Sequence, residues 1–225
     1  MEPSNYLVNR KPLHDLIRSG RLYKVPKGQN LQSTDHRVLF NLIESGYVKR
    51  YLISNDGSLG VQYIAGPNYF FPLTPVFDTL MGQKIYSGPE VYYYQTITDV
   101  ELYSIEPEVL KQASENNPLV YKALLSEAGV RLQDNIQKLE NLSLKSSYKR
   151  LAHLLSFYAG QFGIKTASGT RLEVPLTHQD FADSLSVTRE TISAAMVQLR
   201  KKGLIKTSDG IIITNKEKLQ DEAYS

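Results

Sequence analysis

Two adjacent charged residues, Arg189 and Glu190, stand at the start of a predicted helix in the last third of the chain. Thr188 precedes them as an N-cap, and hydroxyl groups follow at Thr191 and Ser193. A guanidinium, a carboxylate and several hydroxyls at one exposed helix end can form hydrogen bonds with base edges and phosphates. The residue types and their spacing therefore indicate a surface that binds a polyanion.

Two short amphipathic helices would position these groups. The first begins at Thr177 with a capping-box pattern to Asp180. A turn at 186–187 leads to the second helix, and a connection this short predicts a steep crossing, as in a helix-turn-helix. The segment after the second helix, KKGLIKTSDGIIIT, predicts a two-stranded wing that turns at Asp209-Gly210. A helical hairpin that only packs is the alternative. The expected inner faces hold Phe181, Ala182, Leu185, Ile192, Ala195, Met196 and Leu199.

Basic residues concentrate in the same part of the chain. Residues 145–206 hold ten Lys or Arg against four Asp or Glu, which gives +6, whereas residues 51–105 hold one against five, which gives −4. A basic C-terminal third on a mildly acidic body indicates a polyanionic partner for one part of the chain. A solvated basic face without a partner is the alternative on charge alone.

The first hundred residues predict antiparallel β-structure. Segments such as LGVQYIAG and VYYYQTITDVELYSI are rich in Val, Ile, Thr and Tyr, and turn residues separate them. The pair Asp56-Gly57 suits a tight hairpin because both residues tolerate a positive φ. Several short strands at close spacing predict a barrel or sandwich.

A long helix is predicted after Pro118. From Tyr121 its seam positions recur at alternating steps of three and four residues, which is typical of a coiled coil. Asn135 favours a dimer, because one polar seam residue can fix register and partner number. Leu124 and Ile136 are expected on a flank that faces the strands, and a core helix of a monomer is the alternative. The predicted dimerisation residues are Tyr121, Leu125, Ala128, Leu132, Asn135, Leu139 and Leu142.

The segment LTHQDFADSLSVTRETISAAMVQLRKKGLI, residues 176–205, resembles the DNA-binding motif of the Crp/Fnr family of transcriptional regulators. The order of predicted elements is similar to that family over nearly the whole chain. The resemblance implies an α+β protein with an N-terminal antiparallel β-roll, which is cupin-like and similar to a cyclic-nucleotide-binding domain, over residues 1–105. A helical linker with the dimerisation helix would follow over residues 106–146, and a winged helix-turn-helix over residues 147–225. The implied function is a homodimeric regulator that binds near-palindromic sites in double-stranded DNA.

The resemblance also implies roles for individual residues. Arg189 would read guanine and Glu190 would accept a hydrogen bond from a cytosine amino group, with Ser193 as a third base reader. Ser186 stands in the turn where Gly is usual, which predicts mild backbone strain, and Ala194 stands where the best-known members have a second base-reading Arg. The predicted phosphate contacts are Thr177, His178, Gln179, Thr188, Thr191, Lys201, Lys202 and Lys206.

The region that corresponds to the family's cyclic-nucleotide cassette, residues 65–94, holds no Arg. Lys84 is its only basic residue, and a lone Lys replaces a planar guanidinium poorly against a cyclic phosphate. We therefore expect no control by cyclic AMP. A pocket for another small-molecule ligand is the alternative, with ordinary aromatic packing between strands as the simpler interpretation. The residues expected to line such a pocket are Tyr63, Tyr69, Tyr86 and Tyr93.

Composition argues against several other classes. Without cysteine there is no disulfide, iron–sulfur cluster or thiolate zinc site, and the four histidines are scattered, so we expect no metal and no cofactor. No nucleophile–base spacing stands out, so we expect no catalytic residues; a β-roll enzyme and a protein-interaction module remain as alternatives. With no secretory signal and no apolar run near about 18 residues, we expect a cytoplasmic protein without a membrane partner. RNA polymerase is an expected partner if the protein activates transcription.

Overall fold

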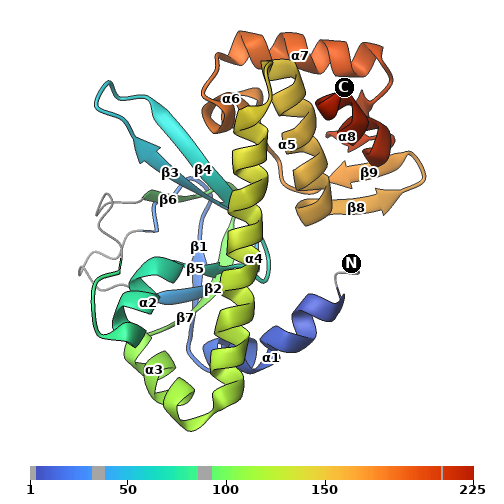
Figure 1. Cartoon of the computed structure of the whole chain (residues 1–225). Coiled ribbons are helices and arrows are strands. Elements are labelled where there is room, and N and C mark those ends of the chain that lie inside the picture. Colours follow the sequence, from blue (N-terminus) through green and yellow to red (C-terminus); the bar gives the residue numbers. More distant parts are fainter. Residues whose placement is uncertain (1–3, 32–38, 86–92, 209) are drawn as a thin grey trace. The chain divides into compact units, whose positions relative to one another are not determined.

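The computed structural model describes residues 4–31, 39–85, 93–208 and 210–225. These residues form two compact units (Figure 1). One unit comprises the described residues of 1–50 and 64–133, and the other comprises 51–63 with those of 134–225. The predicted division at residues 105 and 146 follows changes of element type, and it stays a prediction.

Antiparallel strands form the framework of the N-terminal half. One sheet has four strands in the order β1-β7-β2-β5, and another has three in the order β4-β3-β6. The predicted hairpin joins β3 and β4, but only Gly57, at φ 81°, takes a positive φ, and Asp56 does not, so the expectation that both residues of the pair do so is wrong. The predicted antiparallel β-structure is therefore confirmed. The strands are β1 (Arg21–Val25), β2 (Phe40–Ser45), β3 (Val48–Ile53), β4 (Leu59–Ala65), β5 (Phe70–Phe71), β6 (Tyr93–Thr96) and β7 (Val100–Ile105).

Two helices in this half were not expected from the sequence, which predicted only strands there. They are α1 (Ser4–Arg18), which continues through Pro12, and α2 (Leu73–Met81), which ends at Gly82 in the left-handed conformation. Proline inside or near both segments lowers the helical signal of the sequence. Burial in the core compensates, because α1 contributes fully buried Leu13 and Ile17.

The core of this half is aromatic and aliphatic. Phe40 and Phe70 stack with ring centroids 5.8 Å apart, and Leu124 from α4 (Pro118–Ser143) packs in the same cluster. His14 meets the edge of Phe70 at 4.8 Å. Burial, with Arg18 and Arg10 nearby, lowers the pKa of His14 to about 4, so this imidazole is neutral in the core at neutral pH.

Proline residues start the two helices that follow the strands. Pro107 begins α3 (Pro107–Asn116), and Pro118 begins α4 after the single residue Asn117. The length of α4, 26 residues, agrees with the long helix expected from the sequence.

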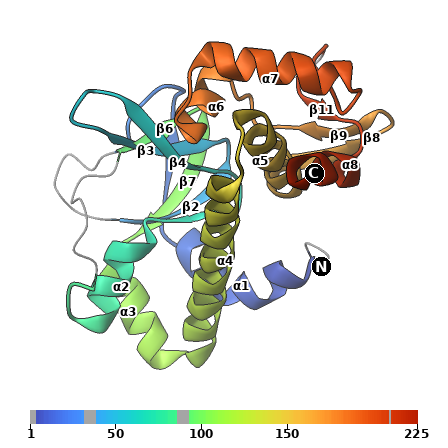
Figure 2. The same cartoon turned by 45° about the horizontal axis from the view of Figure 1, so that its top comes forward.

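The C-terminal half combines helices with a small sheet (Figure 2). Ser146 caps α5, which passes Gly160 and ends at Phe162, with Gly163 as its C-cap. The sheet has four strands in the order β10-β11-β9-β8. The elements are α5 (Ser147–Phe162), β8 (Gly163–Thr166), β9 (Gly169–Leu172), α6 (His178–Leu185), α7 (Arg189–Lys201), β10 (Ile205–Lys206), β11 (Ile212–Ile213) and α8 (Lys216–Tyr224).

Candidate nucleic-acid interface

Helix α6 begins with the predicted capping box. The Thr177 hydroxyl accepts a hydrogen bond from the Asp180 backbone N–H, and the Asp180 carboxylate accepts one from the Thr177 backbone N–H at 2.9 Å. Phe181, Ala182 and Leu185 are buried, as expected for its inner face. The cap and the buried face fix the position of His178, the first residue of the helix.

The turn between the helices uses a non-glycine residue in the left-handed region. Ser186 has φ 51° and ψ 51°. Glycine adopts this left-handed conformation without a steric cost, whereas a residue with a Cβ atom has a steric cost there. Two backbone hydrogen bonds hold the turn, because Ser186 and Val187 both donate to the Ala182 carbonyl. The strained conformation expected at Ser186 is confirmed.

Helix α7 presents its first turn to solvent. Thr188 caps it by accepting from the Thr191 backbone N–H at 3.2 Å. Its buried residues are Ile192, Ala195, Met196 and Leu199, which is the predicted inner face. Arg189, Glu190 and Ala194 are exposed as a consequence.

The polar groups of this turn differ in what they contact. Within the described part of the chain, the side chains of Arg189 and Glu190 have no hydrogen-bond or ion-pair partner. Ser193 is half-buried and lies 2.9 Å from both the Arg189 carbonyl oxygen and His178 Nδ1. The structure therefore leaves two of the three predicted base readers available and engages the third.

Several predicted phosphate contacts also have local partners. Gln179 donates to Asp183 at 2.6 Å, and the hydroxyls of Thr188 and Thr191 are 3.0 Å apart. Lys201 and Lys206 are exposed, and neither side chain has a partner among the described residues.

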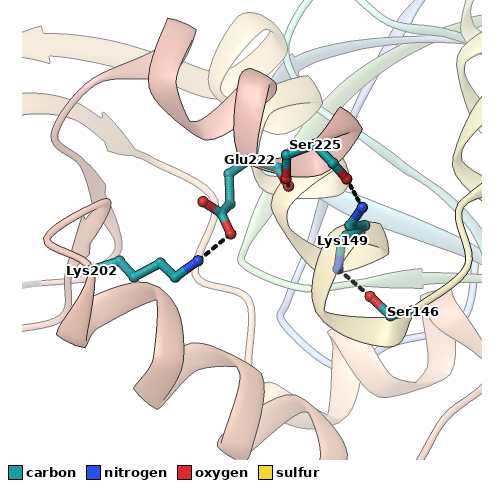
Figure 3. A network of polar contacts seen from close by, with 5 residues as sticks. All are labelled: Ser146, Lys149, Lys202, Glu222 and Ser225. Atoms are coloured by element: carbon teal, nitrogen blue, oxygen red, sulfur yellow. Dashed lines mark hydrogen bonds and ion pairs between the residues drawn. The ribbon is translucent and has the colours of Figure 1, made fainter.

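Lys202 differs from its neighbour Lys201. Its ammonium forms an ion pair with Glu222 of α8 at 2.6 Å (Figure 3). The same ammonium lies 5.4 Å from the centre of the Tyr148 ring. The Glu222 hydrogen bond raises the pKa of Lys202, and the same bond lowers the pKa of Glu222.

The sequence interpretation missed α8. Asn215 caps it by accepting from Lys218 N at 2.8 Å, and Leu219 and Ala223 are buried. A cap residue followed by apolar positions four residues apart is the signal that identifies such a helix. Figure 3 shows that α8 supplies Glu222 to Lys202, and that Ser225, the residue after α8, supplies its backbone oxygen to Lys149.

The wing follows α7 as predicted. Strands β10 and β11 pair antiparallel, with Ile205 opposite Ile213 and Lys206 opposite Ile212. Gly210 has φ 74°, which suits a tight turn, and Asp209 lies outside the described residues. Lys206 is therefore on a short exposed hairpin close to the end of α7 in sequence.

An apolar stripe runs along α4. Leu125 is 73% exposed, and Leu132, Leu139 and Leu142 are each more than 60% exposed. Tyr121 and Asn135 are also exposed, and Ala128 is half-buried. The predicted seam residues thus leave a line of uncovered side chains on this helix.

The flank predicted to face the strands is only partly buried. Leu124 is 2% exposed, as expected, but Ile136 is 44% exposed, so the expectation for Ile136 is wrong. The compact unit that contains Leu124 ends at Gln133, and Ile136 lies beyond that point on α4.

A family model described as a Crp-like helix-turn-helix domain matches residues 149–222. This range includes α6, α7, both wing strands and most of α8. Residues 149–222 are a Crp-like helix-turn-helix domain. The helical hairpin that only packs is thereby a poorer interpretation of this segment.

Curated relatives of the chain are transcriptional regulators. The chain is 26% identical over 183 residues to the "CRP-like cAMP-activated global transcriptional regulator" of Mycobacterium tuberculosis, which covers 81% of this chain and 78% of that protein. It is 28% identical over 130 residues to the "Global nitrogen regulator" of Nostoc sp., covering 58% of this chain and 57% of the relative. The predicted resemblance to Crp/Fnr transcriptional regulators is confirmed.

Solved structures confirm the predicted fold class. A CooA mutant from Carboxydothermus hydrogenoformans superposes with a TM-score of 0.72 at 19% identity, covering 93% of this chain and 90% of that one. FixK2 from Bradyrhizobium japonicum gives 0.72 at 20% identity, covering 89% and 96%. At these identities the likeness shows the fold alone.

The predicted effector tyrosines have separate environments. The Arg131 guanidinium lies 3.2 Å from the Tyr69 ring centre, and Lys138 Nζ lies 5.1 Å from that of Tyr63. Tyr93 is half-buried on β6, and Tyr86 lies outside the described residues. These contacts show two rings stacked against cations of α4 and leave the predicted pocket untested.

No group of three or more His, Cys, Asp or Glu side chains suited to a metal ion occurs among the described residues. Among the described helices, none combines the length and the apolar character that a membrane crossing requires.

Proposed function

We propose that this protein is a homodimeric regulator that binds near-palindromic double-stranded DNA through α7. The observation that supports the proposal most is the exposed first turn of α7. Arg189 and Glu190 lie there without intramolecular partners in the described chain, within a Crp-like helix-turn-helix domain. The N-terminal turn of a recognition helix is the part that meets base edges in the major groove.

Base reading is assigned to the two charged residues. Arg189 can donate two parallel hydrogen bonds to guanine O6 and N7, and Glu190 can accept one from cytosine N4. A carboxylate in a basic surface repels phosphate, so a base contact explains Glu190 better than a backbone contact. Its alternative role is a favourable interaction with the helix dipole, since it lies in the first turn. Ala194 adds no polar group, so the expected site has few direct contacts beyond this pair.

Phosphate contacts are assigned to the caps and to the basic residues around them. The backbone amides at the first turns of α6 and α7 favour anions. Thr177, His178, Gln179, Thr188 and Thr191 lie at these turns, and Lys201 and Lys206 extend the basic surface toward the wing. Lys202 has a competing partner in Glu222, so we expect its contribution to be smaller than that of Lys201.

Replacing Lys201 by Ala should weaken binding to all DNA sequences alike. Each phosphate contact contributes about 0.9 to the slope of log K against log salt, so a dimer that loses two should show a slope shallower by about 1.8. Gel shifts between about 50 mM and about 200 mM salt would measure it. Lys202→Ala is the matched control, with a smaller change expected because its ammonium is already paired. An unchanged slope in Lys201→Ala would contradict the assignment.

Dimerisation is assigned to the stripe on α4. Exposed leucines repeated at seam spacing are costly in water, and a second copy of the same helix can cover them. Asn135, which is exposed on the same stripe, would face its counterpart and set the register.

Control by cyclic AMP is not expected, although one relative is named for activation by it. The cassette region carries Lys84 as its only basic residue, and Lys84 lies outside α2, near its C-terminal end. Calorimetric titration with cyclic AMP should show no heat of binding, and DNA affinity should be the same with and without the nucleotide. Micromolar binding whose heat is lost in Lys84→Ala would contradict this expectation.

A second candidate is control by a non-nucleotide small molecule in the tyrosine-rich β-roll. The contacts of the Tyr63 and Tyr69 rings with cations favour this second candidate. Both cations belong to α4, the helix that also carries the exposed leucines assigned to the dimer interface. A cytoplasmic location, contact with RNA polymerase in activation, and the absence of a catalytic role, cofactor, metal or membrane partner belong to the same proposal. A protein-interaction module would instead show no salt-dependent binding to duplex DNA in the gel shifts.

A further inference from the structure

The contact between the two helices of the motif fixes the protonation pattern of His178. Ser193 Oγ lies 2.9 Å from the Arg189 carbonyl oxygen and 2.9 Å from His178 Nδ1. A serine hydroxyl has one hydrogen, and a carbonyl oxygen can only accept. Both contacts can be made together only if Ser193 donates to Arg189 and accepts from His178, so Nδ1 carries a hydrogen.

This pattern leaves Nε2 as the free edge of the imidazole. No described residue forms a hydrogen bond or ion pair with Nε2, and the side chain is half-buried at the first residue of α6. In the neutral ring with a hydrogen on Nδ1, Nε2 is an acceptor and repels a phosphate oxygen. Protonation converts Nε2 to a charged donor without disturbing the bond to Ser193.

We infer that His178 is a proton-dependent phosphate contact, held in place by Ser193, so that DNA binding takes up a proton at each protomer. The inference rests on the proposed DNA-binding function. Ser193, expected from the sequence to read a base, is here a positioning residue that acts through His178. A positive charge at a helix N-terminus is unfavourable in the free protein and becomes favourable beside a phosphate, which couples the two events.

The charged groups around His178 allow this coupling. Asp180 accepts from Thr177, and Asp183 accepts from Gln179, so both acids of α6 have other partners. Helix α7 presents Arg189 and Glu190 at the same end as Ser193. Helix α5, which also packs on α6, carries five titratable or basic side chains, and each of them contacts residues other than His178. Tyr158 lies against Phe181 and Ser184, Tyr148 lies against Lys202, Lys149 contacts Ser225, and Arg150 and His153 contact Asn141.

Nitrogen NMR of the free full-length protein tests the geometry directly. At about pH 8, where an ordinary histidine is neutral, the imidazole signals of His178 should report a hydrogen on Nδ1. Ser193→Ala should abolish that preference, while Ser184→Ala, which removes a hydroxyl from α6 instead, should retain it. A hydrogen on Nε2 in the wild-type protein would overturn the inference.

DNA binding supplies the second test, with fluorescence anisotropy at several salt concentrations. Between about pH 8 and about pH 6, the wild-type salt slope should become steeper by about 1.8, which is two contacts of about 0.9 each. His178→Gln should weaken binding and should show the same salt slope at both pH values. A slope that does not change with pH, or a change that persists in His178→Gln, would overturn the inference and leave the proposed function intact. If no duplex DNA is bound at either pH, the proposed function and the inference about His178 are both contradicted.

Discussion

Replacing Arg189 by Ala is expected to cost roughly 1–3 kcal/mol of binding free energy at the cognate DNA site and to relax discrimination at one base pair. The reason is that the guanidinium is exposed at the start of α7 and forms no hydrogen bond or ion pair with the described residues. Its donors are therefore available to guanine without breaking an intramolecular contact. Binding titrations on the selected site, and on the same site with that base pair changed, would measure both effects.

Arg189→Lys is the matched control for charge. It retains the positive charge but loses the planar pair of donors, so binding to random DNA should be retained while discrimination falls. Thermal unfolding of both variants should resemble that of the wild type, because the side chain contributes no buried contact. A loss of equal size on cognate and random DNA in Arg189→Ala would contradict base reading.

Replacing Leu132 by Glu should dissociate the dimer. Burying one leucine side chain stabilises by about 1.5–3 kcal/mol, and a symmetric seam loses this contribution twice, so the dissociation constant should rise more than about 100-fold. Two facing carboxylates add repulsion. Sedimentation at micromolar concentration should show a dimeric wild type and a monomeric variant, and the variant should bind DNA much more weakly because only one half-site is engaged.

Gln133→Glu controls for the added charge. Gln133 is exposed and adjacent to Leu132, but it lies off the seam spacing, so this variant should remain a dimer. A monomeric wild type, or identical masses for the wild type and Leu132→Glu, would contradict the assignment of α4 as the dimer interface.

Local patterns predicted the helix-turn-helix in detail. Its caps at Thr177 and Thr188, its buried faces and the left-handed Ser186 depend on residues a few positions apart, which a sequence displays directly. The strands and the long α4 were predicted for the same reason. Helices α1 and α2 were missed because prolines weaken their local signal and tertiary burial stabilises them.

Long-range partners could not be predicted from local patterns. The sequence does not indicate that Lys202 pairs with Glu222, 20 residues away, or that Ser193 meets His178 across the turn. Both contacts depend on how separate helices pack, and both change the role expected for a residue. Ile136 was misassigned because periodicity shows which side of α4 a residue occupies, but not where the packed core ends.

Selection of bound sequences from a random duplex library tests the central claim most directly. The proposal predicts enrichment of a near-palindrome whose half-sites are centred about one helical turn, 10–10.5 base pairs, apart or a multiple of it, each with a G·C pair that Arg189 reads. The same selection with Arg189→Ala should lose the preference at that pair. Recovery of no enriched sequence, or of an asymmetric site that the variant selects equally well, would contradict sequence-specific binding by a homodimer through α7.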